Sequence, residues 1–128
     1  MTRILIADDH EIMRRGIRSV LESHGGFDVC EAKDGKEAIE KTKELKPDLV
    51  ILDVSMPVLD GFSAAREIRK DFPSIPILFF SLHRTGPFTE VAQKIGVSGY
   101  VTKTEDRQTL LRAVHAALTN ETYFPVYP

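Results

Sequence analysis

The chain has 128 residues, of which 42% are hydrophobic and 28% charged, a balance that suits one soluble domain with a single core. Its formal net charge of -2 argues against a domain that binds nucleic acid directly by neutralising phosphates. The single cysteine, Cys30, excludes an internal disulfide and favours a reducing compartment. The first apolar run, residues 4–7, is too short for a signal peptide or a membrane span, so we expect a cytoplasmic protein without membrane contact.

Short apolar runs alternate with amphipathic stretches along the chain. The runs that we expect to form strands lie at 3–7, 27–32, 49–52, 77–80 and 99–101. Runs that are apolar almost throughout are typical of strands covered on both faces of a parallel sheet. The run at 27–32 instead mixes apolar and polar residues in partial alternation, which indicates an edge strand.

The amphipathic stretches predict five helices. Asp34 and Asp60 stand where they can cap the second and third helices, which we expect to end at Leu45 and before Pro73. Gly96 closes the fourth helix. The apolar residues that define the first, fourth and fifth helices are Met13, Ile17, Val20 and Leu21; Phe88, Val91, Ala92 and Ile95; and Leu110, Leu111, Val114, Ala117 and Leu118.

Five strands alternating with five helices predict an α/β fold with a five-stranded parallel sheet. An edge position for the second strand favours the flavodoxin-like strand order 2-1-3-4-5, with the helices on both faces of the sheet. We assign this domain to residues 1–120. Residues 121–128 contain two prolines and show no periodicity, so we interpret them as the start of a linker or a C-terminal tail.

Acidic residues follow two of the predicted strands. In the order 2-1-3-4-5, ligands bind beyond the carboxyl ends of the first and third strands, where the strand order switches. The first strand ends in Asp8 and Asp9, and the third in Asp53. Carboxylates brought together repel one another, and oxygen ligands favour a hard cation such as Mg²⁺.

Two further side chains suit an incoming phosphoryl group at the same edge. The fourth strand ends in Ser81, and Lys103 follows the fifth. A hydroxyl donor and an ammonium group are what phosphoryl oxygens require. Taken singly, each residue has a plainer interpretation, since an aspartate after a strand is more often a helix cap. Their coincidence at one edge favours a functional site.

Several blocks of the sequence resemble the response-regulator receiver domain of two-component signalling. The blocks are residues 4–10, residues 47–57 together with 60–61, Ser81, and residues 96–103. They occur in the order and at spacings like those of the family, and the resemblance covers about residues 2–120. It implies the flavodoxin-like fold and a phosphorylation-controlled switch.

The resemblance implies a role for each acidic position. Asp53 would accept a phosphoryl group from a sensor histidine kinase or a small phosphodonor. Asp9 would bind Mg²⁺ directly and Asp8 largely through water, and Asp53 and the backbone carbonyl of Ser55 would complete the metal ligands. Lys103 would pair with the phosphoryl oxygens.

The resemblance also implies how the switch would work. Ser81 would hydrogen-bond to the phosphoryl group and move toward Asp53, and Tyr100 would be the switch aromatic whose ring turns inward. Such a domain is a signalling module rather than a metabolic enzyme, with self-catalysed phosphoryl transfer and autodephosphorylation. Homodimerisation, through the first and fifth helices or around the fourth and fifth, is left open.

Two positions depart from the family pattern. Leu82 stands where a small residue usually follows the switch hydroxyl, so we expect slow phosphorylation by small donors, slow hydrolysis, or both. Thr104 stands where proline commonly follows the lysine, a departure often seen in receivers attached to LuxR-type DNA-binding domains. DNA contact is therefore expected only through such a C-terminal effector domain. His83 could face the site and influence the attacking water.

Three other functions compete with this interpretation. A flavodoxin-like cofactor module would need a phosphate-binding loop where the chain has Asp8 and Asp9. A phosphatase with an aspartyl intermediate would need a second acid two residues after Asp53, where the chain has Ser55. An interaction module that no longer accepts phosphate is disfavoured by the complete set of site residues. We interpret the face formed by Arg14, Arg15 and Arg18 as a solvated helix surface, although the resemblance implies that a sensor kinase docks near the first helix.

Overall fold

The computed structural model describes residues 1–82 and 86–124. Five parallel strands form one sheet in the order β2-β1-β3-β4-β5, which confirms the predicted flavodoxin-like topology. The strands are β1 (Thr2–Ala7), β2 (Phe27–Ala32), β3 (Leu49–Leu52), β4 (Ile77–Ser81) and β5 (Gly99–Thr102). The helices are α1 (Glu11–His24), α2 (Gly35–Leu45), α3 (Gly61–Asp71), α4 (Gly86–Ile95) and α5 (Arg107–Leu118).

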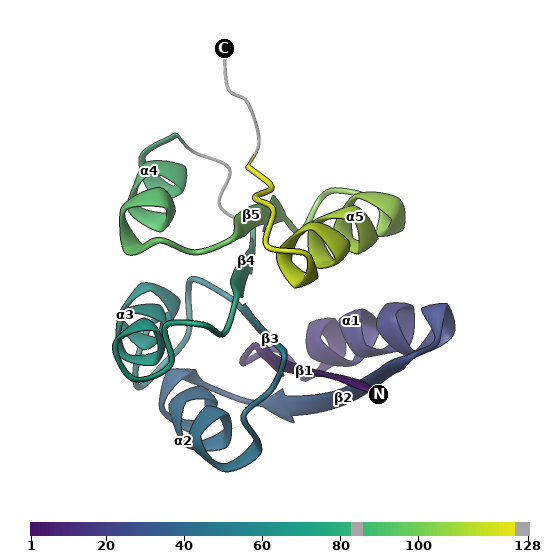
Figure 1. The fold of residues 1–128 in the computed structure, drawn as a ribbon, viewed down its shortest axis with the longest axis horizontal. Coiled ribbons are helices and arrows are strands. Elements are labelled where there is room, and N and C mark those ends of the chain that lie inside the picture. Colours follow the sequence, from purple (N-terminus) through teal and green to yellow (C-terminus); the bar gives the residue numbers. More distant parts are fainter. Residues whose placement is uncertain (83–85, 125–128) are drawn as a thin grey trace.

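The helices cover both faces of the sheet. Helices α1 and α5 lie on one side, and α2, α3 and α4 lie on the other (Figure 1). Alternate side chains of the central strands divide between two cores: Leu5 and Val50 belong to the core under α2–α4, and Ile4 and Ile51 to the core under α1 and α5. Burial on both faces explains why β1, β3 and β4 appear in the sequence as nearly continuous apolar runs.

The predicted helix ends are confirmed. The Asp34 carboxylate accepts the Glu37 backbone N–H at 2.8 Å, and the Asp60 carboxylate accepts that of Ser63 at 2.8 Å. Helix α2 ends at Leu45 because Lys46 adopts the left-handed conformation, with φ 45°. Asp106 caps α5 in the same way through the Thr109 N–H, a cap that the sequence analysis missed.

The two edge strands of the sheet, β2 and β5, differ in how they are covered. Strand β2 forms one edge, as its mixed pattern predicts. At the other edge, Tyr123 donates its N–H to the Ser98 carbonyl at 2.8 Å and accepts the Tyr100 N–H at 2.9 Å. The first residues of the predicted linker therefore pair with β5 and cover its open edge. Residues 125–128 lie outside the described part of the chain, so the boundary at 120 stays a prediction.

Within residues 1–82 and 86–124, no helix combines the length and the apolar character that crossing a membrane would require.

Candidate functional site

The carboxyl ends of the strands bring the predicted site residues together. Strand pairing places Ala7 opposite Leu52, so Asp8 and Asp53 follow neighbouring positions on β1 and β3. The Asp53 N–H donates to the Ala7 carbonyl at 2.9 Å, and the Lys103 N–H donates to the Ser81 carbonyl at 2.7 Å. The sheet ladder therefore continues one residue past the strands, which holds these positions in register.

Lys103 lies between two buried carboxylates. Its Nζ is 2.7 Å from Asp8 Oδ2 and 3.0 Å from Asp53 Oδ2. The three side chains are at most 5% exposed. Hydrogen bonds that involve charged groups are strong, and water screens them little at this depth. Together with Asp9, these residues form what we call the acidic rim.

The negative charge of the acidic rim exceeds what Lys103 neutralises. Burial raises the pKa of Asp53, and the neighbouring Asp8 raises it further, although Lys103 opposes both effects. Burial alone would lower the pKa of Lys103, but its hydrogen bonds to Asp8 and Asp53 outweigh burial and raise it. Lys103 is therefore charged at neutral pH, and the rim is electrostatically suited to a further cation.

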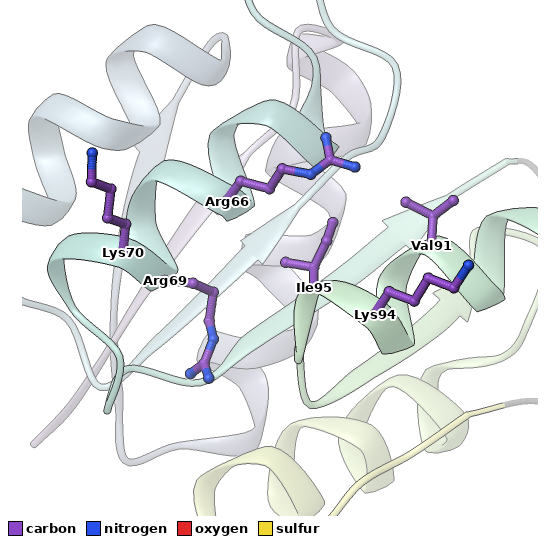
Figure 2. A pocket seen from close by; sticks show the side chains of 6 residues that line it. All are labelled: Arg66, Arg69, Lys70, Val91, Lys94 and Ile95. Atoms are coloured by element: carbon purple, nitrogen blue, oxygen red, sulfur yellow. The ribbon is translucent and has the colours of Figure 1, made fainter.

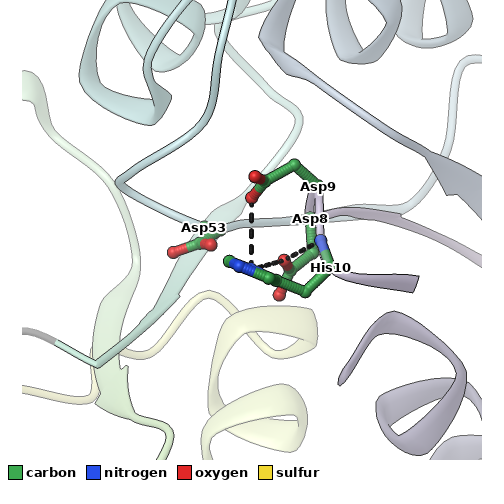
Figure 3. A group of neighbouring side chains, drawn as sticks. All are labelled: Asp8, Asp9, His10 and Asp53. Atoms are coloured by element: carbon green, nitrogen blue, oxygen red, sulfur yellow. Dashed lines mark hydrogen bonds and ion pairs between the residues drawn. The ribbon is translucent and has the colours of Figure 1, made fainter. Parts of the chain in front are cut away.

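Asp9 and His10 complete a potential metal-binding cluster. One ligand atom from each of Asp8, Asp9, His10 and Asp53 lies within 4.8 Å of the others (Figure 3). His10 occupies the N-cap position of α1, but its side chain makes no capping hydrogen bond. Its ring Nδ1 is 3.4 Å from Asp8 Oδ1 and 3.3 Å from Asp9 Oδ1. Three carboxylates fit a hard divalent cation such as Mg²⁺. The sequence analysis did not name His10 as a site residue, although it directly follows the two aspartates.

The backbone beyond β3 packs tightly against α3. Gly61 donates its N–H to the Val54 carbonyl at 2.8 Å, and a Cβ at Gly61 would collide with the Asp53 carbonyl. Burial raises the pKa of Asp53, and a backbone hydrogen bond from Ser55 to its carboxylate only partly opposes that rise. The proposed metal contact of the Ser55 carbonyl stays a prediction. Val58, 76% exposed, has a φ of 70°, an uncommon conformation for a β-branched residue.

The two predicted switch residues are both buried. Ser81 ends β4, and neither Ser81 nor Tyr100 has exposed surface. The Tyr100 ring packs 6.2 Å from that of Phe79, within the core under α2–α4. The ring is therefore already turned inward in this structure. Leu82 follows Ser81 and is 62% exposed, and His83 lies outside the described residues.

A second cluster of charges corrects the interpretation of α1. Arg14 is only 15% exposed, and its Nε is 2.7 Å from Glu31 Oε1 on β2. Arg18 Nη1 is 2.7 Å from Glu31 Oε2. We call these three residues the arginine clamp. The solvated-surface interpretation is wrong for Arg14, whose Nη1 also donates to the Asp8 carbonyl at 2.7 Å. Arg15, which is 70% exposed, fits that interpretation.

A different hollow, of about 540 Å³, lies between α3 and α4. Its lining residues, drawn in Figure 2, are Arg66, Arg69, Lys70, Val91, Lys94 and Ile95. They include none of the predicted site residues. Their positive charges would repel a metal ion, so the acidic rim remains the candidate site.

Comparison with known proteins points to one family. Residues 4–115 match the model of the response regulator receiver domain. The chain is 37% identical over 123 residues to the response regulator protein VraR of Staphylococcus saprophyticus, covering 95% of this chain and 59% of that protein. It is also 37% identical over 121 residues to a protein-glutamate methylesterase/protein-glutamine glutaminase of Methanococcoides burtonii, covering 93% of this chain and 34% of that enzyme.

A solved structure extends the likeness to three dimensions. The crystal structure of a LuxR-family two-component response regulator from Aurantimonas sp. SI85-9A1 superposes with a TM-score of 0.92 at 38% identity. The match covers 96% of this chain and 89% of that one. The curated relatives are longer: the chain spans 59% of VraR and 34% of the methylesterase.

Proposed function

Because this chain belongs to the response regulator receiver domain family, we propose that it is a phosphorylation-controlled signalling switch in which Asp53 is the phosphoryl acceptor. The observation that carries the proposal is the contact of Lys103 with both Asp8 and Asp53 at the carboxyl end of the sheet. A carboxylate held beside an ammonium group and two further acids is suited to phosphoryl transfer, which depends mainly on positioning and charge neutralisation.

The proposed reaction follows from the groups at the acidic rim. A carboxylate oxygen of Asp53 attacks the phosphorus of a phosphohistidine on a sensor kinase; a P–O bond forms, the P–N bond breaks, and the imidazole leaves with its electron pair. Lys103 neutralises phosphoryl oxygens. Asp8, Asp9, Asp53 and the Ser55 carbonyl would hold Mg²⁺, which would neutralise charge on the acids and the phosphoryl group.

The phosphoryl group would change the hydrogen bonding of the rim. It adds a charge of about -1.5 to -2 and several acceptor oxygens next to Lys103. Ser81 ends β4, and its backbone carbonyl accepts the Lys103 N–H. Ser81 and Lys103 would therefore both respond to the phosphoryl group. Tyr100 lies on β5, three residues before Lys103. We propose that Ser81 and Tyr100 relay phosphorylation to an output surface.

The output is proposed to be transcription control through an attached DNA-binding domain. The similarity to LuxR-family regulators supports this output. One relative is an enzyme, but the match covers 34% of it, so we propose signalling rather than catalysis of another substrate for the receiver. Homodimerisation through α1 and α5, or around α4 and α5, stays a prediction.

Intact mass spectrometry tests the phosphoryl acceptor. After incubation with Mg²⁺ and acetyl phosphate, or with a phosphorylated sensor kinase, the chain should gain the mass of one phosphoryl group. Asp53→Asn should abolish the gain, and chelation of the metal should prevent it. Asp34→Asn is the matched control, because asparagine also caps helices well. Equal labelling of Asp53→Asn, or no labelling by either donor, would contradict the proposal and leave an interaction module.

A further inference from the structure

Two histidines meet at the end of the molecule opposite the acidic rim. His24 is the last residue of α1, and His115 lies in the last turn of α5. Their Nε2 atoms are 3.4 Å apart although the residues are 91 positions apart in sequence. Helix α1 begins beside the acidic rim and is 14 residues long, so the pair lies about 20 Å from the rim along the helix.

The separation of the two nitrogens suits a shared metal ion. At 3.4 Å it is longer than the ~3.0 Å typical of a hydrogen bond from a nitrogen donor. In a tetrahedral site with Zn–N bonds of about 2.0–2.1 Å, two ligand nitrogens lie roughly 3.3–3.4 Å apart. The two rings are inclined at 62°, and their centroids are 5.1 Å apart. Both side chains are exposed, so an ion could reach them with its remaining water ligands.

The surroundings of His24 resemble those of a metal ligand. Its Nδ1 lies 3.2 Å from the Gly25 carbonyl, a contact in which Nδ1 donates and Nε2 keeps its lone pair. Metal-bound histidines usually donate the other ring N–H to a carbonyl or carboxylate in this way. Phe27 stacks on the His24 ring at 5.4 Å and lies 6.4 Å from the His115 ring, which limits the movement of both.

The position in the fold also favours a cation. Both histidines lie at the carboxyl ends of their helices, where the helix dipole stabilises positive charge. Imidazole nitrogens prefer Zn²⁺, Ni²⁺ and Cu²⁺ over Mg²⁺. We propose that His24 and His115 form a two-histidine site for a transition-metal ion such as Zn²⁺, with water in the other positions. A bound ion would link the end of α1 to the end of α5.

Calorimetric titration of the full chain with Zn²⁺, in excess Mg²⁺, tests the site. The wild-type chain should bind one more equivalent of Zn²⁺ than His24→Gln or His115→Gln does. If the variants still bind this equivalent, the wild-type chain should bind it at least about tenfold more tightly. His83→Gln is the matched control: it removes one imidazole on the side of the acidic rim, where we expect His83, and should keep the extra equivalent at the pair. Asp53→Asn accounts for Zn²⁺ at the acidic rim and should keep the extra equivalent.

Histidine NMR signals give an independent measurement. Zn²⁺ should shift the ring resonances of His24 and His115 together, and Cu²⁺ should compete more strongly than Zn²⁺. Circular dichroism establishes that each variant is folded. Identical Zn²⁺ titrations of the wild type and both folded variants, or ring signals that stay unchanged, would overturn the proposal and leave a hydrogen-bonded pair only.

Discussion

Two charge clusters flank the end of β1, and they have opposite compositions. In the acidic rim, one lysine contacts two buried carboxylates. In the arginine clamp, one carboxylate contacts two guanidinium groups that are less buried. Arg14 connects the clusters through the Asp8 carbonyl. The two clusters are therefore neighbours with opposite charge balance: carboxylates are in excess in the acidic rim, and guanidinium groups are in excess in the arginine clamp.

The pKa values of the central acids reflect this difference. Burial raises the pKa of Asp53 in the acidic rim, and Lys103 does not compensate fully. Burial also acts on Glu31, but the hydrogen bonds from Arg18 and Arg14 outweigh it and lower the pKa of Glu31. A buried acid that is not fully neutralised is therefore suited to take up a cation or a phosphoryl group. An acid that is more than neutralised serves to join two elements of the fold.

Removing the lysine should give the largest effect. We expect Lys103→Met to lower the free energy of unfolding by about 3–5 kcal/mol at neutral pH without Mg²⁺, because it removes the ammonium group from between two buried carboxylates. The loss should shrink at acid pH, where the carboxylates are protonated. Urea unfolding measures the change, and Lys94→Met, at an exposed lysine of α4, should stay within about 0.5 kcal/mol of wild type. A difference below about 1 kcal/mol for Lys103→Met would contradict the ionic description of the rim.

The free energy of unfolding should depend on pH in opposite ways in the two clusters. For the partly exposed arginine clamp we expect a change of about 1 kcal/mol. The folded pKa of Glu31 is lowered, so its contribution to stability is present above its unfolded pKa and lost as the pH falls through the folded value. The folded pKa of Asp53 is raised, so its contribution is present below its unfolded pKa and lost as the pH rises through the folded value.

Two neutral variants measure these opposite slopes in metal-free buffer. Glu31→Gln should be less stable than wild type at pH 7 and approach it in acid, and Asp53→Asn should be more stable than wild type at pH 7 and also approach it in acid. Denaturant unfolding from acid to neutral pH gives both curves. Deviations of the same sign for the two variants at pH 7 would refute the contrast.

The smallest effect concerns backbone strain in the segment between β3 and α3. Val58 adopts a left-handed conformation that glycine reaches without steric cost, and its exposed side chain contributes little to packing. Val58→Gly should therefore raise the free energy of unfolding by about 0.5–1 kcal/mol. Val91→Gly, in helix α4, is the matched control and should lower it. Equal losses in the two variants would show that Val58 is not strained.

The sequence predicted the sheet and the meeting of the rim residues for one physical reason. Strands buried on both faces are nearly continuous apolar runs, and parallel strands bring their carboxyl ends to one edge. Asp8, Asp53 and Lys103 could therefore be placed together from the ends of those runs alone. Their chemical roles rest on the family resemblance and the proposed reaction.

Contacts made between elements were harder to predict. Arg14 looked like a surface residue because helical periodicity does not reveal that β2 presents Glu31 to it. The pairing of Tyr123 depends on a sheet edge that exists only in the folded chain. His24 and His115 likewise meet because α1 and α5 cover the same face of the sheet. None of these contacts has a local sequence signal.

The pairing of Tyr123 with β5 has a mechanical consequence. Two backbone hydrogen bonds tie Tyr123 to Ser98 and Tyr100 on either side of Gly99, and β5 ends at Thr102, directly before Lys103. A Cβ at Gly99 would collide with the Tyr123 carbonyl, so the two backbones lie in close contact. A displacement of β5 would therefore pull directly on the chain that leaves α5. Residues 119–124 would thus move together with the edge of the sheet and not independently of it.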